Sequence, residues 1–136
     1  MPAGYSGRPL AAKLGLRPGL RAWALGMPDS VAAEIGSELP GFRFAAEPAD
    51  QLDVAHLFIA SRAELEAEIA RLRPLLAPAG MIWVSWPKRQ SKVPTDVTED
   101  TIREVAFPHG LVDVKVCAVD QTWSGLKLVI RKALRT

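Results

Sequence analysis

Residues 54–86 read VAHLFIASRAELEAEIARLRPLLAPAGMIWVSW. The stretches at 54–60 and 81–86 are apolar at nearly every position, which is typical of strands that are covered on both faces. Between them, Ser61 and Glu64 have the spacing of a capping box, so a helix is expected to begin there. A strand, a helix and a strand joined this closely form a right-handed parallel crossover, which predicts an α/β domain.

Further elements are expected on both sides of this unit. Asp29 or Ser30 is expected to cap a helix after the first strand, and Thr95 to Thr98 to open the helix before the last parallel strand. In that last strand the apolar residues alternate with more polar ones, which predicts an edge strand with Val114 and Val116 on its covered face. The predicted parallel strands are 20–25, 42–46, 54–60, 81–86 and 112–120, and 126–131 is expected to return antiparallel.

The chain has 136 residues, about the length of one domain, so we expect a single Rossmann-like domain over 1–136, with 1–19 forming a short helix and a turn. The element order predicts three layers and a mostly parallel sheet that ends in an antiparallel hairpin strand.

Composition excludes several classes of protein. A net charge of +2 and a pI near 8.9 are too weakly basic to argue for nucleic-acid binding or for a membrane-surface role. The most apolar stretch, 75–84, is much shorter than the ~20 residues of a membrane-spanning helix, and no secretory signal is expected at the start. The single cysteine, Cys117, excludes an intrachain disulfide. These features predict a cytoplasmic protein.

Several segments carry a resemblance to a known family. Lys13 to Gly19, leading into Arg21 to Gly26, is similar to the approach to the first strand of the class I S-adenosylmethionine-dependent methyltransferase family. Leu52-Asp53-Val54 resembles the start of its fourth strand, Leu75 to Val84 the passage into its fifth strand, and Gly110 to Ile130 its closing hairpin. The resemblance implies a methyltransferase-like fold and, at Gly26 and Glu47, the positions of a cofactor site.

The sequence departs from that family where the cofactor binds. Ala24 replaces an acidic residue in the first strand, and Met27 and Pro28 replace the glycines that follow it. The third strand and its helix are missing, because little chain separates 42–46 from 54–60. S-adenosylmethionine is therefore a disfavoured cofactor, and Glu47 alone occupies the position of the ribose-binding acid.

A second resemblance is closer. Ser85 to Lys88 and Ser91 to Asp96, with Val114 to Asp120 and Thr122 to Lys127, are similar to a small family of uncharacterised bacterial proteins. That family implies no activity.

Ligands of open α/β sheets bind beyond the carboxyl ends of the parallel strands. Two tryptophans and several cations are expected to converge at that edge, where flat apolar faces and positive charge suit a small anionic or aromatic ligand. The candidate ligand-binding residues are Trp86, Lys88, Lys92, Trp123, Ser124 and Arg62, with Arg89 as a further cation.

The sequence indicates no catalytic residue and no metal site. His56 lies inside a buried strand and is expected to be a core histidine, hydrogen-bonded to backbone or water. His109 falls at the opposite edge of the sheet, and Cys117 is expected to be a packing residue. With the histidines and the cysteine set aside, the side chains that could act as a general acid or base are Glu47, Asp50 or Lys88.

Three hypotheses remain at this stage. The preferred one is a non-catalytic binding or interaction module on a degenerate methyltransferase-like fold, whose partner is a small ligand or another protein. The second is a minimal S-adenosylmethionine-dependent enzyme in which Gly26 and Glu47 hold the cofactor. The third is a homodimeric structural protein that pairs through the edge strand 112–120 or through an exposed tryptophan surface.

Overall fold

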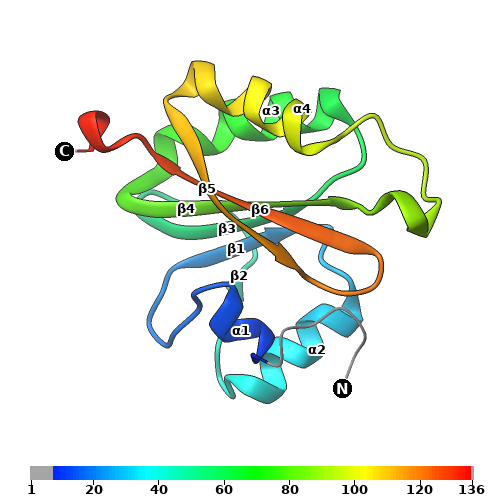
Figure 1. Ribbon diagram of the computed structural model, residues 1–136. Coiled ribbons are helices and arrows are strands. Elements are labelled where there is room, and N and C mark those ends of the chain that lie inside the picture. The colour runs from blue at the N-terminus through cyan, green and yellow to red at the C-terminus, as the bar shows by residue number, and fades with distance from the viewer. Residues whose placement is uncertain (1–7, 136) are drawn as a thin grey trace.

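A six-stranded sheet lies between two layers of helices in the computed structural model, which describes residues 8–135 (Figure 1). One face is covered by α3 (Arg62–Leu72) and α4 (Glu99–Ala106), and the other by α1 (Leu10–Lys13) and α2 (Asp29–Glu38). Each helical layer packs its apolar side chains on the sheet and forms a separate buried cluster with it. The predicted α/β class with three layers is confirmed.

The strands follow the order β2-β1-β3-β4-β6-β5 across the sheet. The first four strands are mutually parallel, and β6 runs antiparallel to both of its neighbours, as predicted. The strands are β1 (Ala22–Leu25), β2 (Phe44–Ala45), β3 (Leu52–Phe58), β4 (Leu76–Pro87), β5 (Leu111–Ala118) and β6 (Trp123–Ile130). Short 3₁₀ turns are η1 (Arg73–Leu75), η2 (Arg89–Ser91), η3 (Phe107–His109) and η4 (Lys132–Leu134). No helix within 8–135 is long and apolar enough to cross a membrane.

The β3-α3-β4 unit forms as its sequence predicts. Ser61 Oγ accepts the backbone N–H of Glu64 at 3.3 Å and caps α3. The returning bond from the Glu64 side chain is not made, so half of the predicted capping box is present. The complete reciprocal box lies instead at the start of α4, between Thr98 and Thr101. Because Val54 pairs with Met81 in parallel register, the two buried strands are neighbours, as expected.

Two local predictions are wrong. Helix α2 begins at Asp29 itself, with Pro28 at the N-cap and no side-chain cap, so neither Asp29 nor Ser30 caps it. In β5, Val114 and Val116 are 56% and 51% exposed, although their alternation predicted a covered face. The cause is a register irregularity between Asp113 and Lys115, which changes which residues of the strand point inward.

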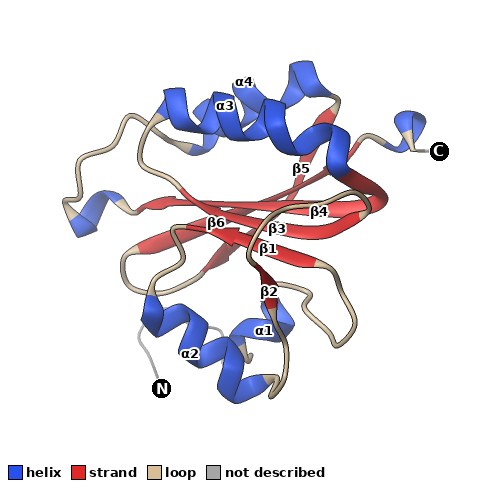
Figure 2. Ribbon diagram, turned by 180° about the vertical axis from the view of Figure 1, so that it is seen from behind, coloured by secondary structure: helices blue, strands red, loops and turns tan. Residues whose placement is uncertain are grey.

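The connection from β2 to β3, residues 46–51, contains no helix. Most parallel crossovers need a dozen or more residues and place a helix on the sheet. The predicted omission of a strand and a helix at this point is therefore confirmed, and the sheet face beside β2 has no helix from this crossover to cover it. Figure 2 shows β2 as the outer strand on that side.

One prediction tests the turn after β1. Gly26 has a φ of +69°, and a Cβ there would lie 3.0 Å from the backbone oxygen of Phe58. Gly26→Ala is therefore expected to lower the free energy of unfolding by about 1–3 kcal/mol. Gly36→Ala is the matched control, because Gly36 is exposed in α2 with no atom near its Cβ position, and it should stabilise by about 0.5–1 kcal/mol. Equal urea midpoints for the two variants would contradict this account.

Candidate ligand-binding groove

A groove with a volume of about 530 Å³ lies beneath the loop that follows β4. Its apolar wall includes the indole of Trp86, which is half-buried, and the buried Val97. The remaining lining comes from the loop and from the start of α4. The complete lining is Trp86, Pro87, Arg89, Lys92, Val93, Pro94, Thr95, Val97 and Thr98.

Backbone and hydroxyl contacts fix the path of this loop. Ser91 Oγ donates to the backbone oxygen of Lys88 at 2.6 Å and closes the first turn. Thr95 Oγ1 donates to the backbone oxygen of Ala60 at 2.7 Å and accepts the N–H of Val97. Because Ala60 lies just beyond β3, the loop returns across the carboxyl end of the neighbouring strand.

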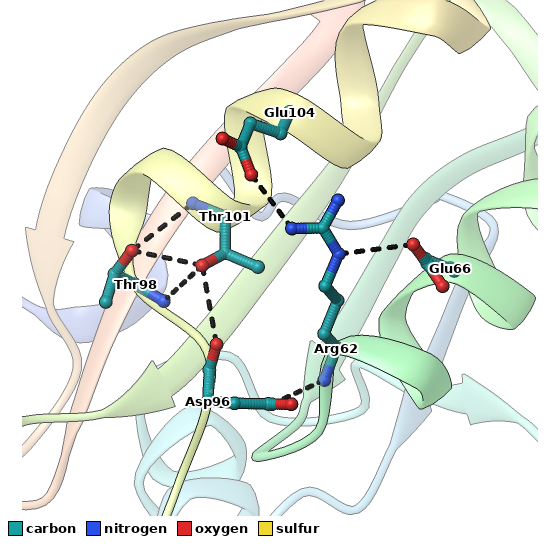
Figure 3. Close-up of polar contacts among 6 residues, drawn as sticks. All are labelled: Arg62, Glu66, Asp96, Thr98, Thr101 and Glu104. Carbon is teal, nitrogen blue, oxygen red and sulfur yellow. Dashed lines mark hydrogen bonds and ion pairs between the residues drawn. The ribbon is translucent and has the colours of Figure 1, made fainter.

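Arg62 links this loop to both helices of its layer (Figure 3). Its backbone N–H donates to Asp96 Oδ1 at 2.7 Å, while its guanidinium bonds Glu66 at 3.2 Å and Glu104 at 2.8 Å. The hydrogen bonds to Glu104 and Glu66 raise the pKa of Arg62. Arg62, which was predicted to bind a ligand, is therefore paired with carboxylates of the protein itself. Its contacts position the loop after β4 against the two helices.

Two cations of the groove have no such partners. Within residues 8–135, the side chains of Arg89 and Lys92 make no hydrogen bond or ion pair. Lys92 has a φ of +61°, a left-handed conformation that is uncommon outside glycine, asparagine and aspartate. No carboxylate belongs to the lining, so the groove carries positive charge beside an apolar wall.

The predicted convergence of two tryptophans in one cleft is wrong. Trp86 pairs in register with Ser124, so Trp123 lies one residue out of step and on the opposite face. Trp86 packs with the α3 and α4 layer, whereas Trp123 packs edge-on against Phe58 in the other cluster. Lys88 and Ser124 do not line the groove either.

Neither the turn after β1 nor Glu47 lines the groove. Met27 packs against the cluster of α1 and α2, and Pro28 provides no N–H at the start of α2. Glu47 is exposed and lines a different hollow, about 400 Å³ in volume, which has no residue of the Gly26 turn in its lining. The structure therefore does not place Gly26 and Glu47 around one hollow.

The buried polar residues are satisfied within the core. His56 is 2% exposed, and its Nε2 lies 2.7 Å from Ser85 Oγ, so the core role is confirmed with a hydroxyl partner. Burial lowers the pKa of His56 to about 3, and the ring is therefore neutral near pH 7. Burial also raises the pKa of Cys117, which disfavours the reactive thiolate. Residues 8–135 contain no cluster of three His, Cys, Asp or Glu side chains suited to a metal.

The fold is that of class I S-adenosylmethionine-dependent methyltransferases. Similar solved structures are LepI with SAH and a substrate analogue (TM-score 0.56, 11% identity), Aeropyrum pernix fibrillarin with S-adenosyl-L-methionine (0.54, 17%) and Synechocystis magnesium protoporphyrin IX methyltransferase (0.52, 14%). They cover 90%, 88% and 82% of this chain, which spans only 39%, 74% and 59% of theirs. Identities this low establish the fold alone.

The family follows from the sequence. The model for the protein of unknown function DUF3052 matches residues 11–132, so the chain belongs to that family. A comparison with curated protein sequences gave no match. The resemblances of fold and of family found in the sequence are both confirmed.

The burial of His56 predicts that the free energy of unfolding depends on pH. The unfolded histidine takes up a proton below its usual pKa of about 6.5, whereas the folded one stays neutral down to about pH 3. The free energy of unfolding should therefore fall as the pH drops from 6.5 towards 3, by up to about 1.4 kcal/mol per pH unit from this group.

The double variant His56→Leu with Ser85→Ala removes both partners and should flatten this dependence. Ser85→Ala alone keeps the buried imidazole and should keep the steep dependence. Urea denaturation between pH 7 and pH 4 measures both slopes. If the double variant were as acid-sensitive as the wild type, His56 would not be the titrating group.

Proposed function

We propose that this protein is a non-catalytic binding module on a methyltransferase fold, whose groove holds a small anionic ligand with a planar or apolar part. The observation that carries the proposal is the placement of Arg89 and Lys92, which have no side-chain partner within 8–135, beside the indole of Trp86. A cation in a partly desolvated groove makes a charge-assisted hydrogen bond to an anion, and an indole face suits an apolar ring.

The lining also supports binding rather than catalysis. It contains no His, Cys, Asp or Glu, which are the usual general bases and nucleophiles. Its two threonines are already engaged, because Thr95 donates to Ala60 and Thr98 bonds to Thr101 in the capping box. The groove thus offers positive charge and apolar surface, and its lining has no carboxylate, imidazole or thiol to take a proton from a ligand.

A methyltransferase is the alternative function, and the fold is what favours it. The turn after β1 weighs against it in two ways. Pro28 lacks an N–H donor for the carboxylate of S-adenosylmethionine, and Asp29 adds a negative charge in the first helical turn beside it. The residues at this turn therefore fit the cofactor poorly, and we favour the binding module.

The groove is tested with AMP and phenyl phosphate, two probes that join a phosphate to a planar ring. We expect both to bind, and adenosine or inorganic phosphate alone to bind more weakly. Arg89→Ala and Lys92→Gly should each weaken AMP binding about tenfold, because each removes one charge-assisted hydrogen bond. Glycine at position 92 keeps the left-handed backbone available. Titration calorimetry gives the affinities.

Lys132→Ala is the matched control, since Lys132 is an exposed cation of η4 far along the chain and does not line the groove. Its AMP affinity should equal that of the wild type. The proposal fails if neither probe binds, or if binding does not change in the Arg89 and Lys92 variants.

The alternative has a direct test of its own. Because the turn carries Met27 and Pro28 in place of glycines, we expect S-adenosylmethionine to show no micromolar affinity in the same calorimetric titration. A dissociation constant near 1 μM, about 8 kcal/mol of binding free energy, would reverse the preference and support the minimal enzyme.

A further inference from the structure

The hollow that Glu47 lines, about 400 Å³ in volume, lies at the amino ends of β1 and β3 and beside β2. The first residues of β1 and β3, Ala22 and Leu52, are buried and belong to its lining. The half-buried ring of Phe44 adds to the apolar wall. Sites for small molecules have volumes of roughly 300–1,000 Å³ and combine apolar walls with a few polar groups. The hollow is of this kind, and it shares no residue with the groove beside Trp86.

One wall of the hollow is the crossover from β2 to β3, which has no helix. Residues 46–51 form no regular element, and Glu47, Ala49 and Asp50 of this segment line the hollow directly. The segment ends at Gln51, which has a φ of +62°. A left-handed backbone is uncommon for glutamine, and strained residues of this kind cluster at ligand-binding sites.

The lining carries equal numbers of positive and negative side chains. The four charged residues are Arg21, Arg43, Glu47 and Asp50. The guanidinium of Arg21 is engaged, because it donates to the backbone oxygen of Asp50 at 3.5 Å. Within the part of the chain that the structure describes, the side chains of Arg43, Glu47 and Asp50 make no hydrogen bond or ion pair. Opposite charges thus line one hollow without pairing across it.

This balance of charge selects the kind of ligand. An ion of a single sign is attracted by one pair of these side chains and repelled by the other. A zwitterion avoids that repulsion, because its carboxylate can accept from Arg43 while its ammonium donates to Glu47 or Asp50. Both contacts are charge-assisted hydrogen bonds, which are stronger than neutral ones. The apolar wall then suits an apolar group carried by the same molecule.

We propose that this hollow binds a free amino acid with an apolar side chain. Arg43 holds the α-carboxylate, Glu47 and Asp50 hold the α-ammonium group, and the side chain packs against Leu20 and Phe44. Both charges of the ligand are then paired as they leave water, which limits the cost of burying them. The site is independent of the groove beside Trp86, so the two ligands would bind at the same time.

The ligand class is tested by titration calorimetry of the full chain with L-phenylalanine and two analogues that each lack one charge. Phenylalanine should bind. 3-Phenylpropionate, which has no ammonium group, and phenethylamine, which has no carboxylate, should each bind about fivefold more weakly or worse. Glycine, which keeps both charges but has no apolar side chain, should also bind more weakly. Backbone amide chemical shifts at 20–22 and 43–52 should report phenylalanine binding.

Charge-neutral variants test which residue meets which charge. Arg43→Gln should weaken phenylalanine binding about fivefold and leave phenethylamine binding unchanged, because that analogue has no carboxylate. The double variant Glu47→Gln with Asp50→Asn should weaken phenylalanine binding similarly without weakening 3-phenylpropionate. A variant that merely distorted the hollow would weaken both ligands. Arg17→Gln is the matched control, because Arg17 is exposed and does not line the hollow, and it should bind phenylalanine like the wild type.

These variants should keep the urea midpoint of the wild type, because the side chains that they change are exposed. Saturating phenylalanine should leave the affinity for AMP unchanged, so a failure of the groove proposal and a failure of this one are distinguishable. The proposal is overturned if phenylalanine does not bind at millimolar concentrations or if it competes with AMP. It is also overturned if each charge variant weakens phenylalanine and its one-charge analogue equally.

Discussion

Burial of β3 and β4 on both faces leaves no water for the polar side chains that these strands carry, so the protein must satisfy those groups itself. His56 and Ser85 do so across the two strands at 2.7 Å, and the indole N–H of Trp83 donates to the backbone oxygen of Leu14 at 2.9 Å. The first contact joins the neighbouring strands, and the second seats α1 against the sheet. Ser85 is also the residue before Trp86, so the first contact lies next to the point where β4 enters the groove.

The sequence was sufficient to predict the parts whose causes are local. Two doubly apolar runs and the Ser61 cap determine the β3-α3-β4 crossover, and the shortness of 46–51 shows that a strand and a helix are missing. The residues that line the groove could not be predicted in the same way, because they depend on the register between β4 and β6, which the sequence does not show. Trp86 and Trp123 fall on opposite faces only because Trp86 pairs with Ser124, and a shift of one residue would have reversed that outcome.

The same limit explains Arg62 and β5. A cation beyond a strand end predicts ligand binding. In the structure Arg62 instead pairs with Glu66 on its own helix and with Glu104 of α4, which follows the loop after β4. In β5, a single irregularity exposes valines whose alternation indicated burial. Arg89 could have been weighted more heavily from the sequence, because it is a cation in the polar loop that follows a doubly buried strand.

Lys92 is a position at which the fold and the proposed ligand site favour different residues. An L-residue in the left-handed region is strained by roughly 1–2 kcal/mol relative to glycine, and no bond from the Lys92 side chain within 8–135 offsets that strain. The folded state alone would favour glycine or asparagine there. A lysine at this site lowers the stability of the folded state and places a positive charge in the groove, so the proposed ligand site would favour the residue that the fold alone disfavours.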